Sequence, residues 1–411
     1  MDALAREHAA LLEPLAGRQA ALVEELVELA EINSGSENVV GLSRLAGRLQ
    51  ARLEPLAERV ERLALPPRQL VGDDGEMQRR PLGEALWAVC RPEAPLRVLL
   101  VGHLDTVFAA DHPFQQVSRR PDGALKGPGV ADLKGGLLVL LSALEVLESS
   151  PWAAHLGWEV ILNPDEEIGS PGSAPLLAAA ARRNHLGLVY EPAMADGFLA
   201  GARKGSGNFT AVFRGRAAHA GREHHLGRNA LRAMADFCVA VDELNGRREG
   251  LTVNPARVVG GGPLNTVPEL AVLRFNVRLA QAEDQDWLLG ELAALQAAVN
   301  AREGFAMSWH GGFGRPPKPL AGDGARLLEL LADCARRLGC TLGWRDTGGC
   351  CDGNNLAAAG LPNVDTLGVV GGNLHSADEY MWPASLVERA RLSALLLLRL
   401  ASGELEWPPR A

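Results

Sequence analysis

Short apolar runs bounded by Gly and Pro alternate with helix-patterned stretches along this chain, and side chains able to bind a metal follow four of these runs. Such runs are typical of buried parallel strands, and ligands of such a sheet gather at the carboxyl ends of its strands. Side chains far apart in the sequence can therefore meet at one place. The runs and the residues that follow them are 96–102 before His103 and Asp105, 158–163 before Glu166 and Glu167, 187–190 before Glu191, and 363–370 before His375.

Asp132 adds a further candidate ligand, in a Gly-rich loop ahead of a helical run at 137–148. Two His and three carboxylates match the ligand chemistry of zinc and suffice for two metals that share a bridge. His103 and Asp105 lie on one face of a strand, so Asp105 can accept from the far imidazole nitrogen and orient the ring. Glu166 and Glu167 are neighbours and point apart, so one can bind metal while the other faces its water.

Each candidate also has a simpler interpretation. His103 can be a hydrogen-bonded core histidine, Asp132 a helix N-cap, and Glu166 and Glu167 solvated loop acids. Glu191 and His375 are weak signals when taken alone. The five positions together favour the metal site.

The bulk properties indicate a protein of two domains, because 411 residues are many for one core. A net charge of −9 argues against a nucleic-acid partner. The first residues lack a signal-peptide layout, and the apolar stretch 392–400 is too short to span a membrane. Six Cys without framework spacing favour a reduced, cytoplasmic setting.

The pattern of the chain changes near residue 204. Before it come helices in about the first 60 residues, a turn-rich loop or hairpin at 66–84, and alternating strands and helices. After it, 208–215 predicts a strand, 227–244 an amphipathic helix, and 270–280 a strand that is buried on one face only. We therefore expect an α/β fold with domain segments at 1–203 and 316–411 and an inserted α+β unit at 204–315.

Several motifs resemble the two-zinc aminoacylase/carboxypeptidase family, which includes glutamate carboxypeptidase, acetylornithine deacetylase and succinyl-diaminopimelate desuccinylase. The match is nearest to glutamate carboxypeptidase and extends over most of the chain. The motifs are His103-Leu-Asp105-Thr, GVADLKGG at 129–136, DEEIGS at 165–170, Glu191-Pro, RAAHAG at 216–221 and HSADE at 375–379.

The resemblance implies a zinc-peptidase catalytic domain with a mostly parallel central sheet, and a ferredoxin-like inserted lid that forms a homodimer. It implies two Zn²⁺ per chain, replaceable by Co²⁺ or Mn²⁺, with Asp132 as the bridge. One zinc would be held with His103 and Glu191, and the other with Glu167 and His375. Glu166 would be the general base and Asp105 the support of His103. The residues implied to bind substrate are His219, Asn265, Arg278 and Arg315.

Physical chemistry agrees with several of these roles. Glu166 could move a proton from a zinc-activated water to the leaving amine, and His219 could donate to the oxyanion. Arg278 and Arg315 could bind a substrate carboxylate in fork geometry, or they could lie on a solvated sheet face or loop. We expect His219 to reach the active site of the partner chain, because an isolated lid would leave sheet edges uncovered.

Two features depart from the family pattern. Cys350 and Cys351 lie where the family usually has Gly and Thr or Ser, and they could line the pocket, bind metal, sense oxidants or simply fill a tight loop. Phe198 and Leu199 are apolar where glutamate-cleaving members tend to carry a charge. This second departure leaves an apolar or other residue open as the substrate's carboxyl-side residue.

The sequence therefore predicts a cytoplasmic metallohydrolase that cleaves an amide next to a free carboxylate in small N-acyl amino acids or dipeptides. One alternative is an N-acyl amino acid deacetylase on the same scaffold. The other is a catalytically silent dimer that binds a ligand, although a pure binder needs no proton acceptor beside a metal.

Overall fold

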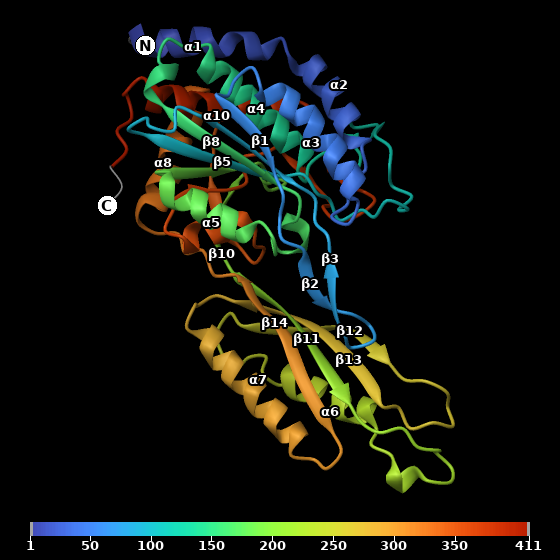
Figure 1. Ribbon diagram of the computed structural model, residues 1–411. Helices are drawn as coiled ribbons and strands as arrows, with labels where there is room; N and C mark the ends of the chain where they lie inside the picture. Colours follow the sequence, from blue (N-terminus) through green and yellow to red (C-terminus); the bar gives the residue numbers. More distant parts are fainter. Residues whose placement is uncertain (1–2, 409–411) are drawn as a thin grey trace.

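The computed structural model describes residues 3–408, and Figure 1 shows two sheets joined end to end. The larger sheet has the strand order β1-β4-β8-β5-β9-β16. β8, β5, β9 and β16 are parallel, whereas β4 is antiparallel to both of its neighbours, so the sheet is mixed. Its strands are β1 (Arg59–Leu63), β4 (Ala85–Cys90), β8 (Gly157–Asn163), β5 (Arg97–His103), β9 (Leu186–Val189) and β16 (Asn363–Val364).

Helices cover both faces of this sheet (Figure 1). The strands β5 and β8 are buried almost throughout, which explains why they appear in the sequence as continuous apolar runs. One face packs on α1 (Ala3–Ala16), α2 (Gln19–Ala30), α3 (Val39–Leu53), α4 (Lys134–Glu148) and α10 (Ala384–Ala401), with α8 (Gly322–Arg337) against α10; the other packs on α5 (Ala174–Arg183) and α9 (Asp352–Ala358).

The second sheet is antiparallel, with the order β12-β13-β11-β14. Two helices cover one face, and the chain order β-α-β-β-α-β with this strand order is the ferredoxin-like arrangement, as predicted. Alternate residues of β13 face the helices, including Leu273, Phe275 and Val277. The elements are β11 (Gly205–Arg214), α6 (Ala230–Asp242), β12 (Thr252–Gly260), β13 (Leu270–Leu279), α7 (Asp284–Asn300) and β14 (Ala306–Arg315).

The turn-rich segment 66–84 forms a hairpin of β2 (Arg68–Val71) and β3 (Met77–Arg80) that reaches the second sheet (Figure 1). Asp73 at its turn pairs with Arg257 and Arg274 of that sheet, at 2.7 and 2.8 Å. The remaining small elements are β6 (Ser118–Arg119), β7 (Leu125–Lys126), η1 (Ala153–His155), η2 (Glu166–Ile168), β10 (Leu199–Arg203), η3 (His224–Leu226), β15 (Trp344–Thr347), β17 (Gly371–Gly372) and β18 (Tyr380–Met381).

One local prediction and one alternative interpretation are wrong. The strand expected at 363–370 pairs in the large sheet only at Asn363 and Val364, because Thr366 has a φ of 65° that ends the extended conformation. The N-cap alternative for Asp132 also fails, since the N-cap position of α4 is Leu133 and no side chain caps the helix.

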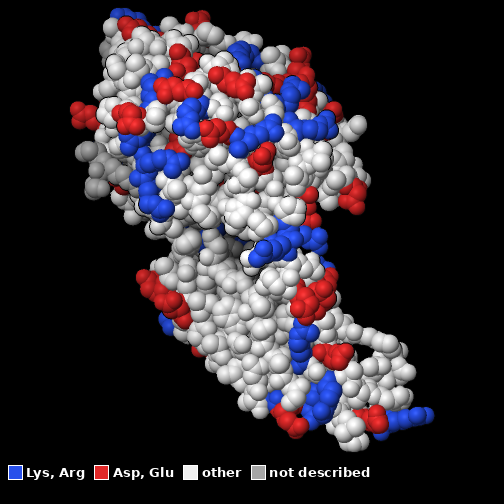
Figure 2. Space-filling model, in the orientation of Figure 1, with Lys and Arg blue, Asp and Glu red and all other residues white. Residues whose placement is uncertain are grey.

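Charged side chains of both signs are intermixed over the part of the molecule that contains the large sheet (Figure 2). In the same view the unit containing the second sheet is largely uncharged in the middle and charged at its margins and tip. Within residues 3–408, no helix combines the length and apolar character needed to cross a membrane.

Candidate metal centre

The carboxyl edge of the large sheet brings the five predicted ligands together in two groups of three. The first contains His103, Asp132 and Glu191, and the second contains Asp132, Glu167 and His375. Within each group the candidate ligand atoms lie within 4.8 Å of one another. His103 ends β5 and Glu191 follows β9, as expected for neighbouring parallel strands.

Asp132 belongs to both groups because its two carboxylate oxygens face different histidines. Oδ1 lies 3.1 Å from Nε2 of His103, and Oδ2 lies 3.3 Å from Nε2 of His375. His103 Nε2 is also 3.8 Å from Glu191, and His375 Nε2 is 3.2 Å from Glu167. A carboxylate divided in this way has the geometry of a bridge between two cations.

Asp105 contacts His103 through both its backbone and its side chain. The nearest acceptor for Nδ1 of His103 is the Asp105 backbone carbonyl at 2.9 Å, whereas the Asp105 carboxylate lies 3.4 Å away. The carboxylate also accepts from the backbone N–H groups of Glu166 and Glu167, each at 3.1 Å, and from the Ser36 hydroxyl at 2.7 Å. Asp105 therefore holds the turn that carries Glu166 and Glu167.

Other supporting residues escaped the sequence analysis. Glu379, buried, accepts from the backbone N–H groups of Ala131 and Asp132 at 2.9 and 3.1 Å and so holds the loop of the shared ligand. Lys134 donates to the carbonyls of Ala30 and Ile32, which ties α4 to the end of α2. Glu379 and Lys134 lie inside quoted motifs, but Ser36 is 69 residues from Asp105 and no local pattern marks it.

Electrostatics at this edge are dominated by buried carboxylates. Burial raises the pKa of Glu167 to about 8, with a further contribution from Asp132. The bonds of His375 to Asp132 and Glu167 raise its pKa to about 11. Burial opposes the ionised form of Asp132, but His103 and His375 outweigh it and lower the Asp132 pKa. Clustered buried acids are costly unless cations compensate them, so the donor set fits two divalent metal ions.

Glu166 lies beside the ligands but belongs to neither group. Its carboxylate oxygen Oε1 pairs with Nη2 of Arg315 at 2.7 Å, and both side chains are buried. Burial raises the pKa of Glu166 to about 7, although Arg315 opposes this shift. A carboxylate with such a pKa can both accept and release a proton near neutral pH.

Arg278 and Arg315 lie at the same end of the second sheet, since both pair with Ser206 of β11. Arg278 is half-buried and donates to Cys350 Sγ at 2.8 Å. His219 and Asn265 are exposed and lie together in the loops 215–229 and 261–269, which we name the distal tip. The length of β11, about 30 Å, separates them from Ser206, so the chain does not bring them to its own metal ligands.

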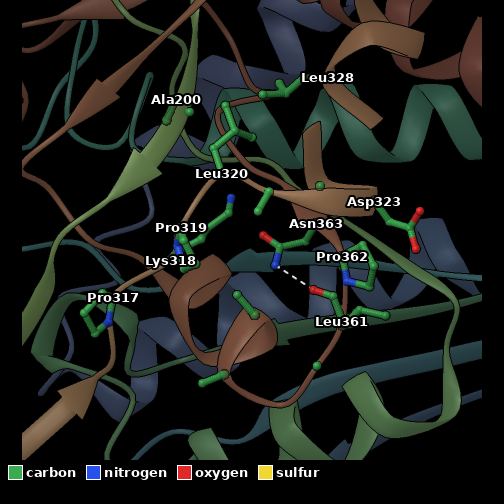
Figure 3. A pocket seen from close by; sticks show the side chains of 16 residues that line it. Ala200, Pro317, Lys318, Pro319, Leu320, Asp323, Leu328, Leu361, Pro362 and Asn363 are labelled. Carbon is green, nitrogen blue, oxygen red and sulfur yellow. Dashed lines mark hydrogen bonds between the residues drawn. The ribbon is translucent and has the colours of Figure 1, made fainter. Parts of the chain in front are cut away.

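A pocket of about 290 Å³ lies away from these ligands, between β10, α8, α9 and β16 (Figure 3). Its lysine, Lys318, pairs with Asp365 at 2.6 Å, and its Asn363 amide donates to the Leu361 and Gly353 carbonyls. Oδ1 of Asn363 is buried without a hydrogen-bond partner among the described residues, but none of the five candidate metal ligands lines the pocket.

The fold and the candidate metal centre are those of a metal-dependent hydrolase, and sequence comparison identifies its family. The pattern of peptidase family M20/M25/M40 matches residues 99–399, and the chain therefore belongs to that family. It is similar to carboxypeptidase G2 of Pseudomonas sp. (strain RS-16), with 28% identity over 401 residues that cover 96% of this chain and 92% of the relative. It is also 31% identical over 239 residues to N-acetyl-L-citrulline deacetylase of Xanthomonas campestris pv. campestris, which covers 55% and 60%.

Solved structures show the same fold. The M20 family metallo-carboxypeptidase Sso-CP2 from Sulfolobus solfataricus aligns with a TM-score of 0.72 at 15% identity, covering 93% of this chain and 99% of the other. The YXEP protein of Bacillus subtilis, described as a dinuclear metal-binding peptidase, aligns with a TM-score of 0.63 at 15% identity, covering 94% and 99%. The predicted fold class and family are confirmed.

Proposed function

We propose that this protein hydrolyses an amide bond next to a free carboxylate, in small N-acyl amino acids or dipeptides, with metal ions as cofactors. The observation that carries this proposal is the division of the Asp132 carboxylate between His103 and His375, with Glu166 poised beside both ligand groups. Similarity to a carboxypeptidase over 96% of the chain supports it.

The ligands proposed for two zinc ions per chain are His103 and Glu191 for one, Glu167 and His375 for the other, and Asp132 for both, with Co²⁺ or Mn²⁺ as substitutes. Bound zinc would supply a Lewis acid for the scissile carbonyl and lower the pKa of water to about 7. Glu166 would take the proton of that water and deliver it to the leaving amine. Asp105 would hold Glu166 in place through the backbone bond described above.

We assign substrate binding to Arg278, which lies at the junction between the large sheet and the second sheet. His219 and Asn265 would bind substrate from a second copy of the chain. Nδ1 of His219 accepts from the N–H groups of Gly221 and Arg222 at 3.1 Å, which leaves the proton on Nε2 for donation to an oxyanion. Leu264 at the distal tip is fully exposed, and β12 is a sheet edge, so a dimer would cover both.

The proposed division of the chain keeps 1–203 and 316–411 as the catalytic domain and 204–315 as the lid that dimerises. We also propose a cytoplasmic location, supported by six cysteines that are all free.

Metal analysis and a substrate panel test the function. We expect about two zinc ions per chain, and hydrolysis of N-acetyl amino acids or dipeptides with a free carboxylate that chelators abolish. Faster hydrolysis of acetyl substrates than of dipeptides would favour the deacetylase alternative. Metal-loaded protein that binds these compounds without cleaving them would favour the silent dimer and contradict the proposal.

A further inference from the structure

Arg315 connects the second sheet to the proposed catalytic base. It is the last residue of β14, where its backbone pairs with Ser206 of β11. Its guanidinium leaves that sheet and lies against the turn that follows β8. Nη2 lies 2.8 Å from the backbone carbonyl of Glu166 and 2.7 Å from its carboxylate. One guanidinium therefore contacts both the backbone and the side chain of the same residue.

The surroundings of Arg315 leave it little freedom to meet a substrate. Its side chain is 9% exposed, and Nη2 also lies 3.2 Å from the Ser170 hydroxyl and 3.6 Å from Asp352. Asp352 is buried and accepts from Ser170 and Asn163, so the acceptors around the guanidinium are themselves fixed. A buried charge with such fixed partners is costly to move.

Arg278 is the natural comparison because it flanks Ser206 from the strand on the other side. It is half-buried and donates to Cys350 and to the amide oxygen of Asn276. Among residues 3–408, no carboxylate forms an ion pair with it. Both arginines contact Cys350 Sγ, Arg278 at 2.8 Å and Arg315 at 3.9 Å, but only Arg315 pairs with the proposed base, so Arg278 is the one available to an incoming carboxylate.

We propose that Arg315 is a positioning residue that holds the Glu166 carboxylate beside the metal ligands, and that it does not bind the substrate carboxylate. This inference rests on the proposed function of Glu166. It assigns substrate recognition at the junction to Arg278 alone. It also means that the placement of the base depends on the second sheet, because the backbone of Arg315 belongs to β14.

Kinetic constants of Arg315→Ala and Arg278→Ala distinguish the two roles, with the fastest compound of the N-acetyl amino acid and dipeptide panel as substrate. We expect Arg315→Ala to lower kcat by about 10- to 100-fold with KM within about twofold of wild type, because it disturbs a general base worth about 10²-fold or more. Arg278→Ala should mainly raise KM. A large rise in KM for Arg315→Ala, with kcat unchanged, would restore the substrate-binding role and overturn the inference.

A double-mutant cycle with Glu166→Gln adds a readout that general damage would not produce. If Arg315 acts through Glu166, Arg315→Ala should change the residual rate by less than about twofold once Glu166 is Gln. Losses that multiply fully would contradict the inference. Binding of the free amino acid product, measured by calorimetry with metal-loaded protein, should be unchanged by Arg315→Ala and weakened by Arg278→Ala.

Arg315→Lys guards against a variant that fails to fold, since it keeps the charge but its ammonium ends short of the position of Nη2, the nitrogen that contacts Glu166. A crystal structure of this variant should show Glu166 displaced from its wild-type position, with the metal content unchanged. An undisplaced Glu166 would overturn the inference. This readout needs no turnover, so it still applies if the wild type hydrolyses no compound in the panel, a result that would count against the proposed function instead.

Discussion

The carboxyl edge of the large sheet and the distal tip of the second sheet hold their polar residues in opposite ways. At the edge, Asp105, Asp132 and Glu166 are buried and each is held by neighbours from distant parts of the chain. At the tip, His219 and Asn265 are exposed, and the side-chain hydrogen bonds of His219 are local. Under the proposed function, one chain would complete its metal centre, and the distal tip would supply substrate-binding residues to a second chain.

We expect the largest loss of metal and activity when Asp132, the ligand shared by both groups at the carboxyl edge, is removed. Asp132→Ala takes one ligand from each group, so we expect loss of both metals and a fall in activity of about a thousandfold or more, since metal catalysis is worth several kcal/mol. Metal analysis and rate measurements check this. Asp378→Asn is a matched control, because Asp378 is an exposed acid of the motif at 375–379 and pairs with Lys126. A variant that lost only one metal would show that Asp132 is not a bridge.

We expect substitutions of the adjacent acids Glu166 and Glu167 to affect different properties, turnover for the first and metal content for the second. Glu166→Gln should keep both metals and lower kcat by roughly 10²-fold or more, because it removes the general base. Glu167→Gln should deplete the metal that it shares with Asp132 and His375. Metal content per chain separates the two outcomes. The opposite pattern, with metal lost from Glu166→Gln, would reverse the assignment.

Mixing two inactive variants tests the proposal that the distal tip completes the active site of a neighbouring chain. If His219 serves the neighbouring site, Glu166→Gln and His219→Ala chains are each inactive, but a mixed dimer has one site with both lesions and one with neither. After subunit exchange, activity should return to about a quarter of wild type, since half the dimers are mixed and each has one intact site. Persistent inactivity in confirmed mixed dimers would rule out exchange of His219 between chains.

Acid should lower the stability that ion pairs at the junction between the two sheets contribute. Asp365 pairs with Arg203 and Lys318, which lie on the two segments that join the sheets, and its pKa is about 2 because these cations outweigh its burial. A depressed carboxylate pKa stabilises the fold above the unfolded value of about 4, and the gain is lost as pH falls from about 4 to 2.

Asp365→Asn should therefore lower the stability at pH 7 by about 3 kcal/mol, because it leaves two buried cations unpaired. Thermal unfolding at pH 7 and at about pH 3 measures this, and the gap to wild type should narrow at the lower pH. Glu28→Gln breaks an exposed pair with Arg48 and should change stability by less than about 1 kcal/mol. A gap that does not narrow in acid would show that charge is not the cause.

Sequence reasoning succeeded where the chemistry is local to the end of a strand. His103 and Glu191 follow apolar runs that form neighbouring parallel strands, so their meeting follows from topology. It failed where partners depend on how distant segments pack: Arg315 reaches Glu166 from another sheet, and Ser36 reaches Asp105 from the loop before α3. Nothing in the run 363–370 marks Thr366 as left-handed, so the break after β16 was also missed.

The smallest effect is expected from the two adjacent cysteines at the junction. Neither belongs to a ligand group. Cys351 is the N-cap of α9, where its Sγ accepts from the Gly353 N–H at 3.3 Å, and Cys350 contacts Arg278. A serine hydroxyl can cap a helix and accept from a guanidinium, so the double Ser variant should keep both metals and change stability by less than about 1 kcal/mol. Double Ala is the control that lacks the cap and should cost about 1 kcal/mol more in thermal unfolding, again with both metals retained. Loss of a metal from either variant would show that this loop supplies a ligand, and the carboxyl edge would then not complete its metal centre from the five predicted residues.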